Sequence, residues 1–126
     1  MRIIFIGAVE FSLETLKATI EAGGKVVGVV TLQSSSFNAD FYDLSKFSIK
    51  KNIPFIYTKD INDNETKKWI KKMRPDIIFC FGWSRLIKEE LLKIPKKGVV
   101  GYHPAMLPKN RGRHPLIWSL ALGLKN

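Results

Sequence analysis

The sequence predicts an α/β fold, a doubly wound Rossmann-like parallel sheet with strand order 3-2-1-4-5. Three observations support this prediction. Short runs that are apolar on both faces alternate with segments of helical periodicity, which is the pattern of strands buried between two layers of helices. The connections are short enough for right-handed βαβ units. With 126 residues, the chain is long enough for one domain with its own core and too short for two.

The first half of the chain supplies two predicted strands around a helix. Residues 1–6 are apolar and rich in isoleucine, and Glu10 interrupts the apolar run too early for a signal peptide, so they predict a buried strand. Ser12 is expected to cap a helix whose apolar positions recur at helical spacing, and residues 26–32 predict the second strand. Residues 33–40 are polar, and they form either a plain surface loop or a loop that lines a site.

The second half continues the alternation of strands and helices. The predicted strands are residues 53–57, 76–81 and 98–102, and the predicted helices are residues 41–51, a helix capped by Asn62 with Glu65 reaching back, residues 88–94 and residues 116–124. The last helix is apolar on most faces and requires covering on several sides. We therefore expect an incomplete chain, which further strands or a partner would complete.

Composition restricts the partners only in part. The formal charge of +10 fits either a lysine-rich solvated surface or attraction for an anion such as a nucleotide, a folate tail or RNA, and the scattered basic residues favour the surface. No apolar run reaches about 18 residues, so no membrane partner is expected. Cys80 is the single cysteine, which predicts a reduced, cytoplasmic protein. Two histidines and one cysteine without ligand spacing predict no metal site.

The stretch from residue 101 to residue 115 is the predicted centre of the chemistry, with three prolines, two histidines and two arginines. His103 follows a predicted parallel strand at the edge where open α/β sheets bind ligands, and an imidazole with a pKa of about 6.5 can take up and return a proton at neutral pH. Arg111 and Arg113 can clamp a phosphate or a carboxylate. His114 is either loop scaffolding or a substrate contact.

Two glycines are expected to flank the crevice at the point where the strand order reverses. Gly7 follows the first strand and Gly82 the fourth, with Trp83 beside it as a flat apolar wall for a planar heterocycle. A buried tryptophan followed by a helix-capping Ser84 is an equally good interpretation. The first turn has one glycine where a dinucleotide fingerprint needs three, and Glu10 would repel phosphate, so a nicotinamide or flavin dehydrogenase is excluded.

At these residues the chain resembles the folate-dependent formyltransferase family. The run from His103 to Pro108, followed by Arg111 and Gly112, is similar to the active-site signature of that family. Counterparts of its amino-terminal half are found in residues 5–7, Phe11, residues 75–76 and residues 82–87. Residues 112–118 look most like the branch that formylates sugar amines. The resemblance implies that residues 1–126 are the amino-terminal portion of a formyltransferase catalytic domain.

The resemblance also implies a reaction and its site. A formyl group passes from the co-substrate N10-formyltetrahydrofolate to a primary amine, here of a nucleotide-linked amino sugar, and His103 matches the family histidine that moves protons or stabilises the oxyanion. The other implied positions are donor-binding Gly82, Trp83, Arg85, Leu86 and Ile87, and substrate-binding Gly7, Phe11, Arg111, Arg113 and His114.

Departures from the family pattern bear on activity. Gly101 stands where the family usually has an asparagine that donates to the oxyanion, and losing one such donor typically costs on the order of a hundredfold in rate. Asn110 is the candidate replacement. After Asp76 the only acidic residues are Glu89 and Glu90, both in a charged helix pattern, so a carboxylate that orients His103 would have to come from Asp76 or an earlier residue, or from residues that the chain lacks. The family aspartate lies beyond the last residue. We therefore expect little or no transferase activity from this chain alone.

Two alternatives stay open. A methionyl-tRNA formyltransferase would have tRNA as its partner, but residues 34–38 lack the basic side chains usual in that branch. A non-catalytic binding module of the same fold, held to a partner through residues 116–124, is the second alternative. A homo-oligomer is compatible with either.

Overall fold

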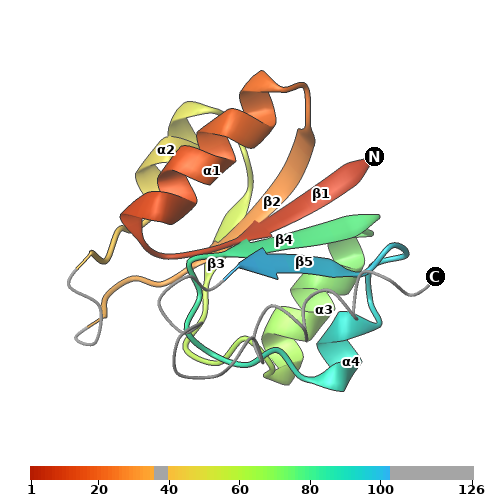
Figure 1. The fold of residues 1–126 in the computed structure, drawn as a ribbon. Coiled ribbons are helices and arrows are strands. Elements are labelled where there is room, and N and C mark those ends of the chain that lie inside the picture. The colour runs from red at the N-terminus through yellow and green to blue at the C-terminus, as the bar shows by residue number, and fades with distance from the viewer. Residues whose placement is uncertain (36–39, 103–126) are drawn as a thin grey trace.

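Figure 1 shows the computed structural model of the chain, which describes residues 1–35 and 40–102. Five parallel strands form one sheet in the order β3-β2-β1-β4-β5, which confirms the predicted topology. The strands are β1 (Arg2–Ile6), β2 (Lys25–Thr31), β3 (Phe55–Tyr57), β4 (Ile77–Phe81) and β5 (Val99–Tyr102).

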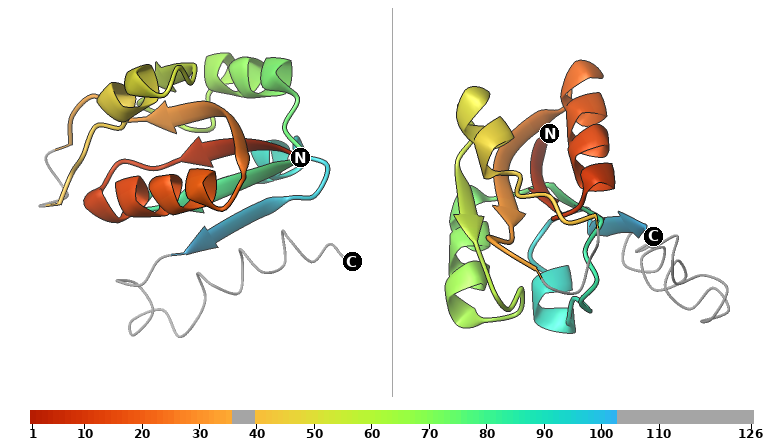
Figure 2. Two further views of the ribbon diagram at one scale, coloured as in Figure 1. Left: turned by 90° about the horizontal axis from the view of Figure 1, so that it is seen from above. Right: turned by 90° about the vertical axis from the view of Figure 1, so that its left-hand side faces the viewer.

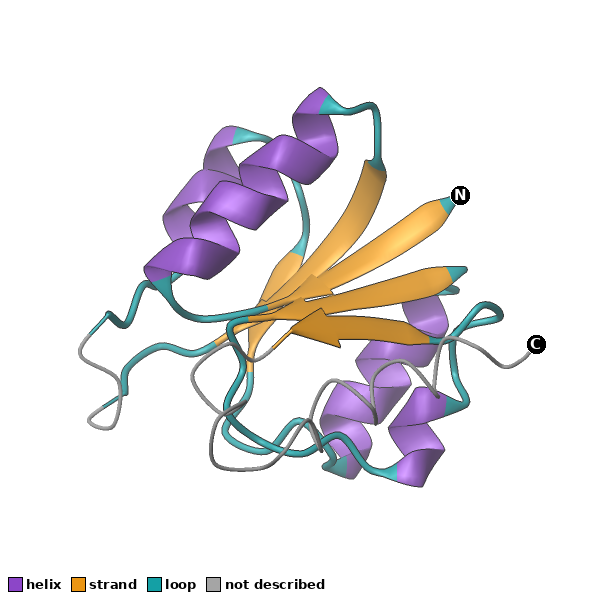
Figure 3. Cartoon of the chain, in the orientation of Figure 1, coloured by secondary structure: helices purple, strands orange, loops and turns teal. Residues whose placement is uncertain are grey.

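Helices cover both faces of the sheet, as a doubly wound fold requires (Figures 1 and 3). The helices α1 (Glu10–Glu21) and α2 (Ser45–Lys50) lie on one face, and α3 (Asn64–Met73) and α4 (Glu89–Leu92) lie on the other. The turned views in Figure 2 show the same three layers. The predicted helix at residues 116–124 lies outside the described residues.

Each layer of helices encloses an apolar core of its own. Ile4 and Ile6 face the core under α3 and α4, while Phe5 between them faces the core under α1 and α2. Successive side chains of a strand point to opposite faces. A strand that meets two cores must therefore be apolar on both faces, which is why residues 3–6 of β1 form one continuous apolar run.

The start of α1 differs from the prediction. The helix begins at Glu10 with Val9 as its N-cap residue, so Ser12 lies inside the first turn rather than before it. The Glu10 N–H donates to the Asp40 carbonyl at 3.0 Å, and the Ser12 hydroxyl accepts from the Val9 N–H at 3.2 Å. Ser12 thus satisfies a backbone group of the helix start from the third helical position.

The start of α3 also differs, by one residue. Asp63 is the N-cap residue, because its Oδ1 accepts from the Thr66 N–H at 2.7 Å. The prediction that Asn62 is the cap was therefore wrong. The Asn62 side chain instead contacts the segment that follows β4. α2 is shorter than predicted, since Phe41 forms a β-bridge with Val9 before the helix begins.

Asp76 joins the amino ends of β1 and β4. Its Oδ2 accepts from the Arg2 N–H at 2.7 Å, and its own N–H donates to the Arg2 carbonyl at 2.8 Å. The hydrogen bond from the Arg2 N–H lowers the pKa of the Asp76 carboxyl below its ordinary value of 3.8, and Lys96 acts in the same direction. Asp76 therefore stabilises the pairing of the two central strands while it is ionised.

We expect Asp76 to contribute to acid unfolding. Its pKa is lower in the folded state, so its contribution is complete above the ordinary value of 3.8 and is lost as the pH falls through the lower folded value. Asp76→Asn keeps an acceptor for the Arg2 N–H but carries no charge. The urea concentration at the midpoint of unfolding should therefore change less for Asp76→Asn than for the wild type between about pH 5 and pH 2.5.

Glu14→Gln is the control for this experiment, because it removes one carboxylate from an exposed position of α1. Equal pH dependence of Asp76→Asn and the wild type would contradict the assigned role of Asp76.

Candidate active site

The carboxyl ends of β1, β4 and β5 meet at one edge of the sheet. Tyr102 at the end of β5 pairs with Phe81 at the end of β4, and Ile6 at the end of β1 pairs with Cys80. The order of the strands reverses between β1 and β4, and open α/β sheets bind ligands at such a switch point. The structure therefore brings the segments after β1 and β4 together, as predicted.

Gly7 and Gly82 lie side by side at this switch point. The Ala8 N–H donates to the Gly82 carbonyl at 3.2 Å, so the turn after β1 is bonded to the turn after β4. Between the two turns lies the Ser12 hydroxyl, which donates to the Phe81 carbonyl at 2.6 Å. The first turn of α1 is thereby fixed to the end of β4.

This contact leaves no room for a side chain at either glycine. A Cβ on Gly7 would lie 2.4 Å from the Phe81 carbonyl oxygen, and a Cβ on Gly82 would lie 2.1 Å from Ser12 Oγ. Gly82 also has a φ of 78°, in the region that favours glycine. Close packing thus accounts for both glycines, and a contact of either one with a bound molecule stays a prediction.

Trp83 lies in the apolar core rather than on the surface of the crevice. Its side chain is 3% exposed and belongs to the cluster that also contains Ile87 and Leu91. The indole N–H has no hydrogen-bond partner among the described residues. Ser84 does not cap α4, because the N-cap residue of that helix is Lys88. The interpretation of Trp83 as a buried residue is therefore confirmed, and the interpretation of Ser84 as a helix cap is wrong.

The rest of the predicted donor segment runs along the same edge. Ser84, Arg85 and Leu86 are exposed, with Leu86 at 56%, while Ile87 is buried at 2%. The exposed stretch is thus fixed at both ends by buried residues, Trp83 and Ile87. Phe11 lies at this edge as well, with its ring packed against Phe81 at a centroid distance of 6.4 Å.

Sequence reasoning missed the residue that holds this segment. The Asn62 side chain donates from Nδ2 to the Leu86 carbonyl at 2.9 Å and accepts at Oδ1 from the Lys88 N–H at 2.8 Å. The sequence gives only a weak signal for this role of Asn62. Asp60, Asn62 and Asp63 are all turn-forming residues within four positions, and the start of α3 needs only one of them as its cap.

Several predicted residues fall beyond the part of the chain that the structure describes. These are His103, Asn110, Arg111, Arg113 and His114. Gly101 is described and lies opposite Cys80 in the pairing of β5 with β4. His103 directly follows Tyr102, the last residue of β5.

Asp76, Glu89 and Glu90 have charged or backbone partners of their own. Asp76 is bonded to Arg2 at the amino edge, the edge opposite to the switch point. Glu89 and Glu90 lie on α4, where Glu89 pairs with Lys93 and Glu90 with Lys67. The prediction that such a carboxylate would come from Asp76 or an earlier residue therefore cannot be met by Asp76 itself.

Cys80 is unsuited to nucleophilic catalysis. Its side chain is completely buried in β4, and burial raises the pKa of its thiol. The thiolate is the reactive form of cysteine, so Cys80 is a packing residue. Among residues 1–35 and 40–102, no three His, Cys, Asp or Glu side chains come together as metal ligands.

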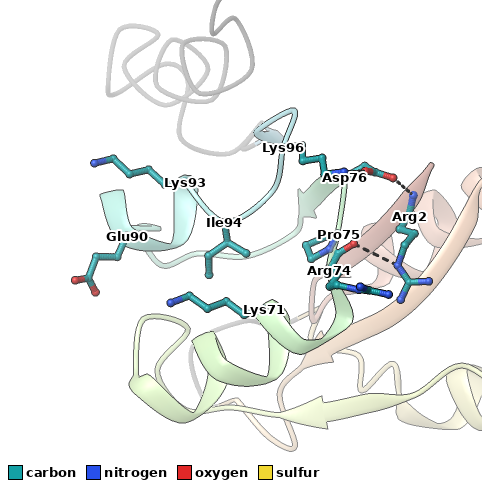
Figure 4. A pocket seen from close by; sticks show the side chains of 9 residues that line it. All are labelled: Arg2, Lys71, Arg74, Pro75, Asp76, Glu90, Lys93, Ile94 and Lys96. Carbon is teal, nitrogen blue, oxygen red and sulfur yellow. Dashed lines mark hydrogen bonds and ion pairs between the residues drawn. The ribbon is translucent and has the colours of Figure 1, made fainter.

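A hollow of about 650 Å³ lies at the opposite, amino edge (Figure 4). Its lining carries five cationic and two acidic side chains, together with Pro75 and Ile94; the charged ones are Arg2, Lys71, Arg74, Lys93, Lys96, Asp76 and Glu90. Because Arg2 begins β1 and Asp76 precedes β4, the hollow is separated from the switch point by the length of the strands. It is not the predicted site.

Comparison with known proteins identifies the family. The formyl transferase family model matches residues 1–126. The chain belongs to the formyl transferase family. This result confirms the resemblance found in the sequence at residues 103–112 and 82–87.

Members of the family from several bacteria align with nearly all of the chain. The bifunctional polymyxin resistance protein ArnA of Wigglesworthia glossinidia brevipalpis is 37% identical over 127 residues, which cover 99% of this chain and 19% of that protein. The methionyl-tRNA formyltransferase of Thermotoga maritima is 33% identical over 120 residues, which cover 92% of this chain and 38% of that enzyme. The chain thus spans well under half the length of these relatives.

A solved structure shares the fold of this formyl transferase family member. Glycinamide ribonucleotide transformylase 1 from Geobacillus kaustophilus superposes with a TM-score of 0.64 at 19% identity, over 94% of this chain and 65% of that one. In the part of the chain that the structure describes, no helix is long and apolar enough to cross a bilayer.

We expect Gly82→Ala to destabilise the protein more than Gly23→Ala. Both glycines have positive φ, 78° at Gly82 and 94° at Gly23, but a Cβ at Gly23 meets nothing within 4 Å. Gly23→Ala should therefore cost about 1 kcal/mol for the backbone alone. Gly82→Ala adds a clash with Ser12 and should cost upwards of about 2 kcal/mol in urea unfolding. Equal losses would mean that the contact with Ser12 relaxes freely.

Proposed function

We propose that this chain forms the donor-binding half of a formyltransferase that moves a formyl group from N10-formyltetrahydrofolate to a primary amine. The observation that carries the proposal is the family match over residues 1–126. The arrangement of the edge supports it, because the strands β1, β4 and β5 end together there and ligands of open α/β sheets bind at this edge.

In this proposal each segment after a strand has its own task. The exposed stretch from Ser84 to Leu86, with Ile87, borders the pterin ring of the donor, which supplies the activated formyl group. His103 takes up the proton that the attacking amine loses, as an imidazole can at neutral pH. Asn110 supplies the hydrogen bond for which Gly101 has no side chain. Arg111, Arg113 and His114 contact the acceptor.

The acceptor proposed here is the amine of a nucleotide-linked amino sugar. The run at residues 112–118 supports this choice, since it looks most like the sugar-amine branch, and paired arginines suit the phosphates of a nucleotide. The alternative acceptor is methionyl-tRNA, because the Thermotoga maritima relative is a methionyl-tRNA formyltransferase at 33% identity. The absence of basic side chains at residues 34–38 counts against tRNA.

Equilibrium binding tests the donor half of the proposal. Titration with 5-formyltetrahydrofolate, a chemically stable analogue of the donor, should give saturable binding by calorimetry. His103→Ala should bind the analogue as the wild type does, because the proton carrier is not needed for donor binding, and should lower any measured formyl transfer roughly a hundredfold or more. A wild-type chain that shows no saturable binding would overturn the proposal.

The acceptor is tested with the same preparation. After incubation with donor, mass spectrometry should detect more N-formyl product from an amino-sugar nucleotide than from methionyl-tRNA. Binding to tRNA that weakens steeply with salt, with product from tRNA alone, would instead establish the alternative. Turnover by the 126-residue chain should be low, because Gly101 leaves the oxyanion without one donor; steady turnover would show that Asn110 or another group compensates.

A further inference from the structure

Asn62 connects the start of α3 with the segment that follows β4. Its side-chain amide makes two hydrogen bonds to one stretch of backbone: Nδ2 donates to the Leu86 carbonyl at 2.9 Å, and Oδ1 accepts from the Lys88 N–H at 2.8 Å. A primary amide offers donor and acceptor side by side, as a peptide group does. Asn62 therefore pairs with residues 86–88 in the way that a neighbouring strand would.

This pairing fixes the direction of the backbone groups between the two bonds. The Leu86 carbonyl and the Lys88 N–H both face the Asn62 amide, so the backbone on either side of Ile87 is held in one arrangement. Ile87 is 2% exposed and anchored in the core, while Leu86 beside it is 56% exposed.

Asn62 is itself held rigidly. Its backbone N–H donates to Asp60 Oδ1 at 2.9 Å, and the Thr58 hydroxyl donates to the Asp60 carbonyl at 2.9 Å. Ile61, which precedes it, is 1% exposed, and Asp63, which follows it, caps α3. The side chain thus acts from a fixed position on a fixed segment, which is what a group needs to set the geometry of a site.

We propose that Asn62 is a positioning residue for the formyl donor. It ties residues 86–88 to the start of α3, and so fixes the place of the exposed residues Ser84 to Leu86, which are proposed to border the donor. This inference rests on the proposed function, because it concerns the donor site of that reaction. Asn62 itself does not touch the donor.

The test compares Asn62→Ala with Asn64→Ala. Asn64 is an exposed asparagine two residues away at the first position of α3, with no side-chain bond to the loop, so it controls for the loss of an amide near the helix start. Asn62→Ala should weaken binding of 5-formyltetrahydrofolate about tenfold, because two hydrogen bonds that order the loop are lost. Asn64→Ala should bind as the wild type does.

Two further measurements separate positioning from general stability. Amide hydrogen exchange in the ligand-free chain should accelerate at Lys88 in Asn62→Ala, while the amides of β4 remain as protected as in the wild type. Where turnover is measurable, KM for the donor should rise in Asn62→Ala and KM for the amine should not. Accelerated exchange throughout β4 would mean that Asn62 is a residue of general stability, and would overturn the inference.

The outcomes distinguish this inference from the function on which it rests. A wild-type chain that binds the donor analogue, with Asn62→Ala binding equally well, overturns the role of Asn62 and leaves the proposed function standing. A wild-type chain that does not bind the analogue overturns the proposed function, and the donor role of Asn62 with it.

Discussion

The contact between the first turn of α1 and the end of β4 is the constraint on which the rest of the structure depends. Ser12 donates to the Phe81 carbonyl from within α1, and Gly7 and Gly82 allow the two turns to approach until their backbones are hydrogen-bonded. Because β1 and β4 are the central strands, this contact fixes where the two halves of the sheet meet. It also sets the point from which the segment after β4 departs.

The two edges of the sheet have different chemistry. At the carboxyl edge, the exposed segment from Ser84 to Leu86 is held by neutral groups, the Asn62 amide and buried apolar anchors at Trp83 and Ile87. At the amino edge, cationic side chains surround a hollow, and Asp76 joins the strands as a charged acceptor. A net charge of +10 thus says little about the reaction, because much of the charge near the sheet lies at the edge away from the predicted chemistry.

The strands and their order were predictable from the sequence, while the residues that position the site were not. β1 is apolar from Ile3 to Ile6 because it meets two cores, and that pattern depends on the strand alone. The placement of Ser12 depends on a carbonyl 69 residues away in the sequence, and the use of Asn62 depends on a loop 24 residues away. Local rules assigned both residues to helix caps, because a serine or an asparagine without a distant partner typically bonds to the nearby backbone of a helix start. Trp83 illustrates the same limit: its burial follows from the packing of α3 and α4, which no short stretch of sequence encodes.

The distribution of aromatic residues between the two cores has an optical consequence. Trp83 lies in the core under α3 and α4, and Trp69 packs against it, whereas the aromatic residues of the core under α1 and α2 are phenylalanines and Tyr42. Among the described residues, tryptophan emission therefore originates from one layer only, the layer that carries the segment after β4. Apart from Trp118, which lies outside the described residues, fluorescence at red-edge excitation therefore reports on the layer of α3 and α4.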